Sequence, residues 1–365
     1  MLKEESIDKN LNDYLKSRFI DAVLDDSEKI LIYDKFDSEL TKLKNGVVIR
    51  NMSDKDFYNL YGNDVFDFLH RISTNSIKDL SSNEKVETLF LNEKGRLIDD
   101  TTLIKTDYEA ILIANMDPNS KLERWIERYI ISEDIKLVKN SGKYFLLEFW
   151  GPQAESYLTL ICGKFVDALT FKNVVNVNVE GLIFKIYKNK TPDGEVYFSL
   201  LGDMLISTRL IEYLLNHNRI FDLGMIGEAA FDYFRIKKGY PKFPNEINVD
   251  FNPHEINLMH KVDDKKGCYI GQEVIARLET YDKVQKEMVG LIFEEFYDVI
   301  QPLEIFETNE KIGKVTSICK FGNNKKIGIG LVKKNKDIYD SKIKLINENN
   351  NQEYFAFVKK LPMKL

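Results

Sequence analysis

The chain has 365 residues, 44% of them hydrophobic, so it is too long for one ordinary domain and apolar enough to bury a substantial core. Its 52 lysines and arginines against 58 aspartates and glutamates give a formal charge of −6, which argues against a dedicated nucleic-acid-binding protein. The three cysteines, Cys162, Cys268 and Cys319, are widely separated, so we expect neither a disulfide framework nor an all-cysteine metal site. The sequence shows no signal-like start and no long apolar run, which predicts a cytoplasmic protein without a membrane span.

The N-terminal third of the chain predicts helices around a strand meander. Residues 1–45 are charged with short apolar patches, and we expect a helix and connecting segments there. Apolar side chains at helical spacing predict a helix over residues 65–72, and a second helix is expected to open at Asp117-Pro118. Between them the sequence predicts three strands, at 86–91, 96–105 and 110–114, with a turn at 92–95.

Strands and helices recur between residues 134 and 238. Helices are expected over residues 204–216 and 227–238, the second stopped by Gly239 and Pro241. The expected strands are 135–138, 145–150, 174–179, 182–188 and 195–201.

From residue 286 onward the pattern changes to short strands, at 288–293, 303–306, 313–319, 327–332 and 343–345, typical of a small β-barrel. We therefore predict an α+β fold in three parts: an N-terminal segment (1–45), an α+β body (46–284) with a break near 140–150, and a C-terminal β-barrel (285–365).

The most informative segment is KGCYIGQE, residues 266–273. Its cysteine, Cys268, is flanked by glycines that leave little bulk around the sulfur. The adjacent Lys265 and Lys266 would favour the thiolate, the form of cysteine that acts as nucleophile or metal ligand. For a lone cysteine, the alternative is a small buried residue without chemistry.

KGCYIGQE resembles the signature of the YgfZ family, folate-binding relatives of the T protein of the glycine cleavage system that act in the maintenance of iron–sulfur enzymes. The resemblance covers most of the chain from about residue 40. Further matching motifs follow in the order of the family: GND (62–64) with TN (74–75), NEKGR (92–96), WGPQA (150–154), FRIKKGYP (234–241), NEI (245–247), NPHE (252–255) and GKVTS (313–317).

The resemblance implies a folate-binding fold of the T-protein type and tetrahydrofolate, or a derivative of it, as the cofactor. A pterin needs amide or carboxylate acceptors and an apolar wall, and its glutamate tail needs a cation. Matching positions make Asn115, Arg235 and Glu246 candidate folate contacts. The alternative for each is a solvated surface residue.

The acidic pair Asp99-Asp100 offers one catalytic candidate, because consecutive strand residues point to opposite faces. Apolarity does not choose between the two faces. Comparison with the T protein through its Asn-Glu-x-Gly turn places Asp100 on the carboxylate that lies near folate N5 and assists aminomethyl transfer. The alternative is a structural aspartate whose side chain accepts from backbone amides.

The sequence also departs from the T protein. Tyr197 falls where the T protein has a pterin-contacting glutamate, although Glu195, two residues earlier, could substitute for it. KGCYIGQE replaces a stretch that lacks cysteine in the T protein. The resemblance therefore implies Cys268 as the functional thiol, in a loop shaped by Lys266, Gly267, Tyr269, Gly271, Gln272, Glu273 and Arg277.

We accordingly expect a tetrahydrofolate-binding accessory protein for iron–sulfur enzymes, tRNA-thiolating enzymes included, whose partners are those enzymes or their assembly proteins. The alternative is a folate-dependent aminomethyltransferase or related one-carbon enzyme. The four histidines have no metal-site spacing, so no resident metal is expected. The lysine pairs of the C-terminal module are typical of solvated faces, and direct nucleic-acid binding is not expected.

Overall fold

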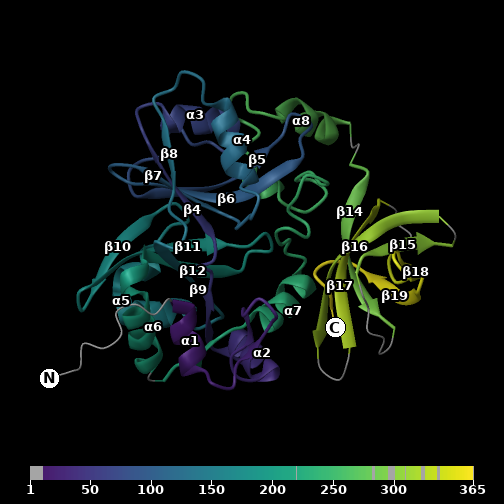
Figure 1. Ribbon diagram of the computed structural model, residues 1–365, viewed down its shortest axis with the longest axis horizontal. Helices are drawn as coiled ribbons and strands as arrows, with labels where there is room; N and C mark the ends of the chain where they lie inside the picture. Colours follow the sequence, from purple (N-terminus) through teal and green to yellow (C-terminus); the bar gives the residue numbers. More distant parts are fainter. Residues whose placement is uncertain are drawn as a thin grey trace. The chain divides into compact units, whose positions relative to one another are not determined.

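The computed structural model describes residues 11–218, 220–281, 284–294, 301–308, 310–321, 325–334 and 338–364. The chain forms two compact units, each assembled from separated stretches (Figure 1). Unit 1 comprises Met1–His70, Asn75–Thr88 and Thr101–Ala230. Unit 2 comprises Arg71–Thr74, Leu89–Asp100 and Phe231–Leu365. The three-part division along the sequence stays a prediction.

The N-terminal part of unit 1 contains two helices, α1 (Leu11–Arg18) and α2 (Phe36–Asn45), where a helix and connecting segments were predicted. Between them a short hairpin of β1 (Val23–Leu24) and β2 (Ile30–Ile32) was not predicted. Residues 1–10 of the predicted segment lie outside the described residues.

A six-stranded sheet forms the larger layer of unit 1, with the order β10-β11-β12-β9-β3-β13. Its neighbouring strands run antiparallel except for β13, which pairs in parallel with β3. One face carries alternate apolar residues, which pack with α1, α5 (Ala154–Cys162) and α6 (Ser207–Asn216) into a core that includes Phe149, Leu200 and Leu210. The strands are β3 (Val47–Asn51), β9 (Tyr144–Trp150), β10 (Val174–Val179), β11 (Leu182–Lys190), β12 (Val196–Asp203) and β13 (Leu223–Met225).

A second sheet has the order β5-β6-β7-β4-β8. Within unit 1, Phe57, Ile104 and Ile111 of this sheet pack with Leu146 and Leu201 of the first, so apolar side chains fill the space between the two layers. The strands are β4 (Asp56–Tyr61), β5 (Glu84–Leu91), β6 (Leu97–Lys105), β7 (Ala110–Ala114) and β8 (Lys136–Lys139).

Further helical segments lie wholly or mostly in unit 1. The predicted helix α3 spans Val65–Ile72, and two short 3-10 helices cover Lys164–Ala168 and Met204–Ile206. Helix α4 (Lys121–Tyr129) begins later than predicted. Asp117 instead forms a turn, with its carboxylate accepting from the Asn119 N–H at 2.9 Å, so Pro118 precedes the helix.

The C-terminal part of unit 2 is a closed six-stranded barrel in the order β14-β17-β16-β15-β18-β19, coloured from light green to yellow in Figure 1. The predicted barrel is therefore confirmed, although its last strand was not predicted. Leu291, Ile305, Leu345 and Val358 are among the residues that fill its core. The strands are β14 (Lys286–Phe293), β15 (Leu303–Glu307), β16 (Glu310–Phe321), β17 (Lys325–Lys333), β18 (Lys342–Asn347) and β19 (Glu353–Lys359).

A second core in unit 2 joins the tip of the β5–β6 hairpin to segment 236–275 and to the barrel. Its members include Leu97, Ile236, Phe251, Tyr269 and Ile329. The helical segments here are α7 (Glu228–Lys238), a 3-10 turn at Met259–Lys261, and α8 (Gln272–Thr280). No helix in the described ranges is long and apolar enough to cross a membrane.

Candidate functional site

The two aspartates of the acidic pair lie on strand β6 and point to opposite faces of it. Its residues alternate between buried and partly exposed, and Asp99, which is 2% exposed, lies on the buried side. The Asp99 carboxylate accepts from the backbone N–H of Asp100 at 2.8 Å. The partly exposed carboxylate is therefore Asp100, the one that comparison with the T protein selects.

Asp100 is paired with a lysine that sequence reasoning missed. Nζ of Lys261 lies 2.7 Å from one carboxylate oxygen of Asp100 and 2.8 Å from the other. Both side chains are mostly buried, with 15% of Lys261 and 16% of Asp100 exposed. A partly buried ion pair is screened by solvent less than an exposed one, so the ammonium offsets much of the carboxylate charge.

The backbone around Lys261 is fixed to the short segment Arg71–Thr74. Oγ1 of Thr74 donates to the carbonyl of Lys261 at 2.8 Å, and the carbonyl of Thr74 accepts from the Asp263 N–H at 3.0 Å. Thr74 in turn bonds strand β5, where its backbone N–H donates to the carbonyl of Leu89 at 3.0 Å. The TN motif thus holds the segment that carries the lysine.

Lys266, the first residue of KGCYIGQE, is anchored to the same segment. Its Nζ donates to the carbonyl of Ser73 at 2.6 Å and lies 5.4 Å from the centre of the Tyr269 ring. Burial lowers the pKa of Lys266 to about 8, against a smaller opposing effect of Asp263. The predicted help of Lys266 to the Cys268 thiolate stays a prediction.

The rest of KGCYIGQE divides between a loop and a helix. Cys268 is exposed, and an added Cβ at Gly267 would meet no atom within 4 Å. Gly271 has a φ of +83° and precedes the first residue of α8, so Gln272, Glu273 and Arg277 lie on a helix that borders the loop of Cys268, and their role in shaping that loop stays a prediction. The helix begins there because glycine supplies the left-handed turn. Arg277 and Glu273 form an exposed i,i+4 pair at 4.0 Å.

Two other motifs meet in unit 2. Arg96 of NEKGR donates to the carboxylate of Glu255 of NPHE and to the carbonyl of Asp250, both at 2.9 Å. Glu255 also accepts from the backbone N–H of Asn252 at 3.0 Å. These motifs are therefore tied together by a charged hydrogen-bond network at the tip of the hairpin that carries Asp100.

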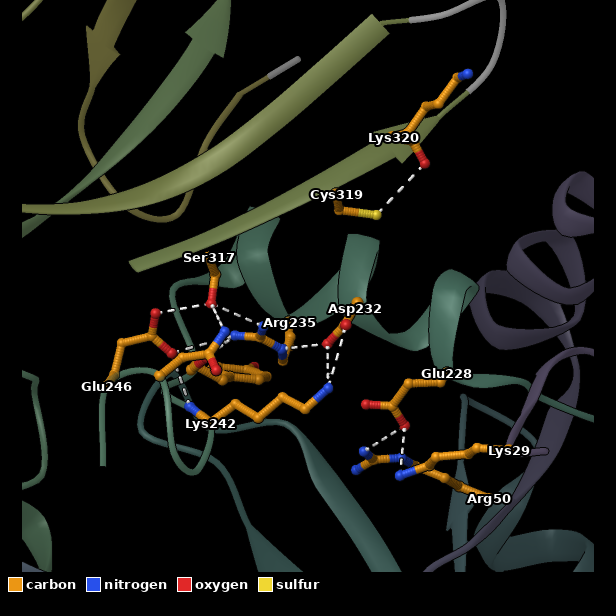
Figure 2. A network of polar contacts seen from close by, with 12 residues as sticks. Lys29, Arg50, Glu228, Asp232, Arg235, Lys242, Glu246, Ser317, Cys319 and Lys320 are labelled. Carbon is orange, nitrogen blue, oxygen red and sulfur yellow. Dashed lines mark hydrogen bonds and ion pairs between the residues drawn. The ribbon is translucent and has the colours of Figure 1, made fainter. Parts of the chain in front are cut away.

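Arg235 and Glu246 lie in a buried network (Figure 2). The guanidinium of Arg235 is 2.5 Å from Asp232, 3.4 Å from Glu246 and 2.9 Å from Oγ of Ser317. Ser317 donates to Glu246 at 2.8 Å, and Lys242 is 3.2 Å from Asp232. Arg235 is 4% exposed and Glu246 is fully buried. Because both bond Ser317 of β16, the network joins α7 and the following turn to the barrel. Folate contact by either residue stays a prediction.

The other predicted folate contacts are in unit 1. Asn115 follows β7, and its side-chain oxygen accepts from Nζ of Lys55 at 2.6 Å. Tyr197 stacks on Trp150, with ring centres 3.9 Å apart and planes 7° apart. Strand β12 begins only at Val196, so Glu195 lies at the end of the hairpin turn instead of on the strand.

A polar row crosses the face of the six-stranded sheet that carries Tyr197, and sequence reasoning missed it. Arg50, Glu148, Ser199 and Tyr187 are successive cross-strand partners on β3, β9, β12 and β11, so their side chains share one face. Arg50 lies 3.6 Å from Glu148, which accepts from the Trp150 indole N–H at 3.0 Å. A charged residue within the apolar strand 145–150 was the signal for this row.

Glu228, the first residue of α7, extends this row. Figure 2 shows Lys29 and Arg50 directed at its carboxylate, at 3.6 and 3.5 Å. A flat aromatic pair beside fixed donors and acceptors is the kind of surface that a pterin requires.

Cys268 is the exposed cysteine, since Cys319 is buried and Cys162 partly buried. Burial raises the pKa of both Cys162 and Cys319 to about 12. Among the described residues, no group of three or more histidines, cysteines, aspartates and glutamates could hold a metal ion.

A family model described as the GCVT N-terminal domain matches residues 18–266. The chain belongs to this family. The predicted kinship with the T protein is thereby confirmed, whereas membership of the YgfZ branch stays a prediction.

Curated relatives match over most of this chain. The aminomethyltransferase of Thermotoga petrophila is 23% identical over 322 residues, which cover 86% of this chain and 85% of the relative. A putative chloroplastic transferase of Arabidopsis thaliana is 25% identical over 308 residues, 83% of this chain and 69% of the relative. The crystal structure of the glycine cleavage system aminomethyltransferase T from Bartonella henselae has a TM-score of 0.78 at 19% identity and covers 98% of both chains. The predicted fold is therefore confirmed.

Proposed function

We propose that this protein binds tetrahydrofolate and catalyses a folate-dependent one-carbon transfer, with aminomethyl transfer as the first candidate. Family membership supports this proposal, as do relatives that are named aminomethyltransferases and match over most of their length. The observation that supports it most directly is the partly exposed carboxylate of Asp100 on β6, the catalytic candidate that the resemblance to the T protein implies.

The residues of the chain suit a reduced folate. The Trp150–Tyr197 pair offers a flat aromatic surface, and the adjacent Glu148 and Arg50 offer an acceptor and a donor for pterin edges. Asn115 is a further candidate contact, and Arg235 and Glu246, which lie in a buried network of unit 2, are two more. When bound, tetrahydrofolate supplies the two nitrogens, N5 and N10, that accept the one-carbon unit.

In transfer from a thioether carrier, bound tetrahydrofolate would take the methylene carbon onto N5 and N10, and the bonds of that carbon to sulfur and to the amine nitrogen would break. The two protons of N5 and N10 would leave with the thiol and with ammonia. Asp100 would accept a proton or stabilise the positive charge that develops on the methylene carbon.

Binding can be tested by calorimetric titration with tetrahydrofolate and by fluorescence. The chain has two tryptophans, so the Trp125→Phe variant leaves Trp150 as its one indole. We expect saturable quenching of Trp150 with the affinity that calorimetry gives. Asp100→Asn should bind the folate but lose aminomethyl transfer by at least about 100-fold. A protein that binds no tetrahydrofolate would refute the proposal.

A second candidate is a tetrahydrofolate-binding accessory role in the assembly or repair of iron–sulfur enzymes in the cytoplasm, tRNA-thiolating enzymes included. The exposed thiol of Cys268 within KGCYIGQE favours it. In a strain that lacks the gene, Cys268→Ala should fail to restore iron–sulfur enzyme activity. The matched control is Cys162→Ala, which removes a mostly buried thiol and should restore it. Full rescue by Cys268→Ala would remove the thiol from this role.

A further inference from the structure

The Asp100–Lys261 pair changes the charge that a bound substrate would meet. Nζ of Lys261 is within 2.8 Å of both carboxylate oxygens, so each oxygen accepts from the same ammonium. The pair is close to neutral as a unit, whereas a carboxylate without a cation would present a full negative charge.

The lysine is held in place by more than this contact. The Lys261 carbonyl accepts from Thr74 Oγ1, and the Thr74 carbonyl accepts from Asp263, two residues further along. With 15% of its side chain exposed, Lys261 is less mobile and less screened than a surface lysine. The ammonium is therefore a fixed part of the surroundings of Asp100.

A fixed positive charge beside Asp100 affects one class of reaction most. In transfer of an aminomethyl group, the methylene carbon becomes more positive as the bond to its leaving group lengthens, and a negative neighbour lowers that barrier. Lys261 weakens this stabilisation because its ammonium lies within 2.8 Å of both carboxylate oxygens. Binding of the uncharged pterin ring depends much less on the net charge at this point.

We infer that Lys261 is a specificity-determining residue for the proposed folate-dependent reaction. Its ammonium offsets the negative charge of Asp100 and so slows transfer of cationic one-carbon groups, while folate binding stays intact. This inference rests on the proposed function. A protein in which Lys261 offsets the charge of Asp100 keeps its folate bound and transfers aminomethyl groups slowly.

The test compares the wild type with K261M, K261R, D100N and the double variant K261M/D100N. The first readout needs no folate: urea unfolding of the four corners of the double-mutant cycle measures the coupling between the two side chains. The second is the dissociation constant of tetrahydrofolate by calorimetry, and the third is the rate of aminomethyl transfer. Lys314→Met, which removes a lysine of an exposed pair with Asp250, serves as the matched control.

K261M should raise the transfer rate by on the order of tenfold while the dissociation constant changes less than about threefold. The gain should vanish in K261M/D100N, because it acts through Asp100. K261R should keep the wild-type rate, since a guanidinium can bond both carboxylate oxygens. Lys314→Met should leave the rate unchanged.

Two results would overturn the inference alone: no coupling between positions 100 and 261, or a K261M rate no higher than wild type with tetrahydrofolate binding intact. Absence of tetrahydrofolate binding to the wild type would instead overturn the proposed function and this inference with it.

Discussion

Gly271 lies against Gly95: a Cβ added at Gly271 would come within 3.2 Å of the Gly95 Cα and 2.7 Å of the Asn92 carbonyl oxygen. The second glycine of KGCYIGQE and the glycine of NEKGR therefore allow the two backbones to approach closely at one point. Both residues also have positive φ, +83° and +67°. Packing of the two backbones against each other thus explains why both motifs, far apart in the sequence, contain a glycine at this point.

Replacing Gly271 by alanine should cost at least about 2 kcal/mol in the free energy of unfolding, because the new methyl group strains φ and meets backbone atoms. Gly267→Ala is the matched control, since no atom lies within 4 Å of its added Cβ. Urea unfolding of both variants measures the difference. Equal stabilities would contradict the assigned close approach.

The buried ion pair between Arg235 and Glu246 predicts a large loss for Glu246→Gln. The substitution keeps the shape of the side chain but leaves the Arg235 guanidinium with less compensating charge, at a cost of about 3 kcal/mol. Lys314→Met, at the exposed pair with Asp250, should cost less than about 1 kcal/mol. Chemical unfolding of the two variants makes the comparison. A loss for Glu246→Gln as small as that for Lys314→Met would count against a structural network.

The lowered pKa of Lys266 predicts that the free energy of unfolding depends on pH. Its pKa falls from 10.5 to about 8 on folding, so the unfolded chain binds more protons between these pH values. The contribution of Lys266 to stability should therefore rise as the pH increases from 8 to 10.5, by up to about 3 kcal/mol. Urea unfolding of wild type and Lys266→Met across this range gives the difference. A pH-independent difference would show that the amine is not desolvated.

The three cysteines should differ sharply in reactivity. Cys268 is exposed, whereas burial holds the pKa of Cys162 and Cys319 at about 12 and keeps them protonated. A thiol reagent at pH 8 should modify one thiol rapidly in the native protein and three in denaturant. The fast phase should disappear in Cys268→Ser and persist in Cys162→Ser. Rapid modification of a second thiol would contradict the burial.

Local patterns predicted many of the regular elements, although they missed strands β3 and β4. The uninterrupted apolar run 110–114 is β7 at its predicted bounds, and the alternation over 174–179 is β10. The predicted barrel followed from closely spaced strands and turns. Such elements are determined by neighbours in the sequence, which a single chain reveals.

Elements that depend on distant partners were not predicted. The three residues of β13 are a strand because Leu223 pairs with Val47, and three residues carry too little periodicity to show this. The Asp100–Lys261 pair joins residues 161 positions apart, and no motif contains Lys261. Family resemblance indicated Asp100, but only the folded chain shows that Lys261 pairs with it.

The discontinuous make-up of unit 2 has a consequence for biosynthesis. Its first segments, Arg71–Thr74 and Leu89–Asp100, leave the ribosome long before Phe231 and the residues after it. At 5–20 residues per second, roughly 10 to 30 s separate the synthesis of Asp100 from that of Lys261. During this interval the hairpin tip lacks the apolar residues that cover it in the folded chain, and a chain truncated before Phe231 would never supply them.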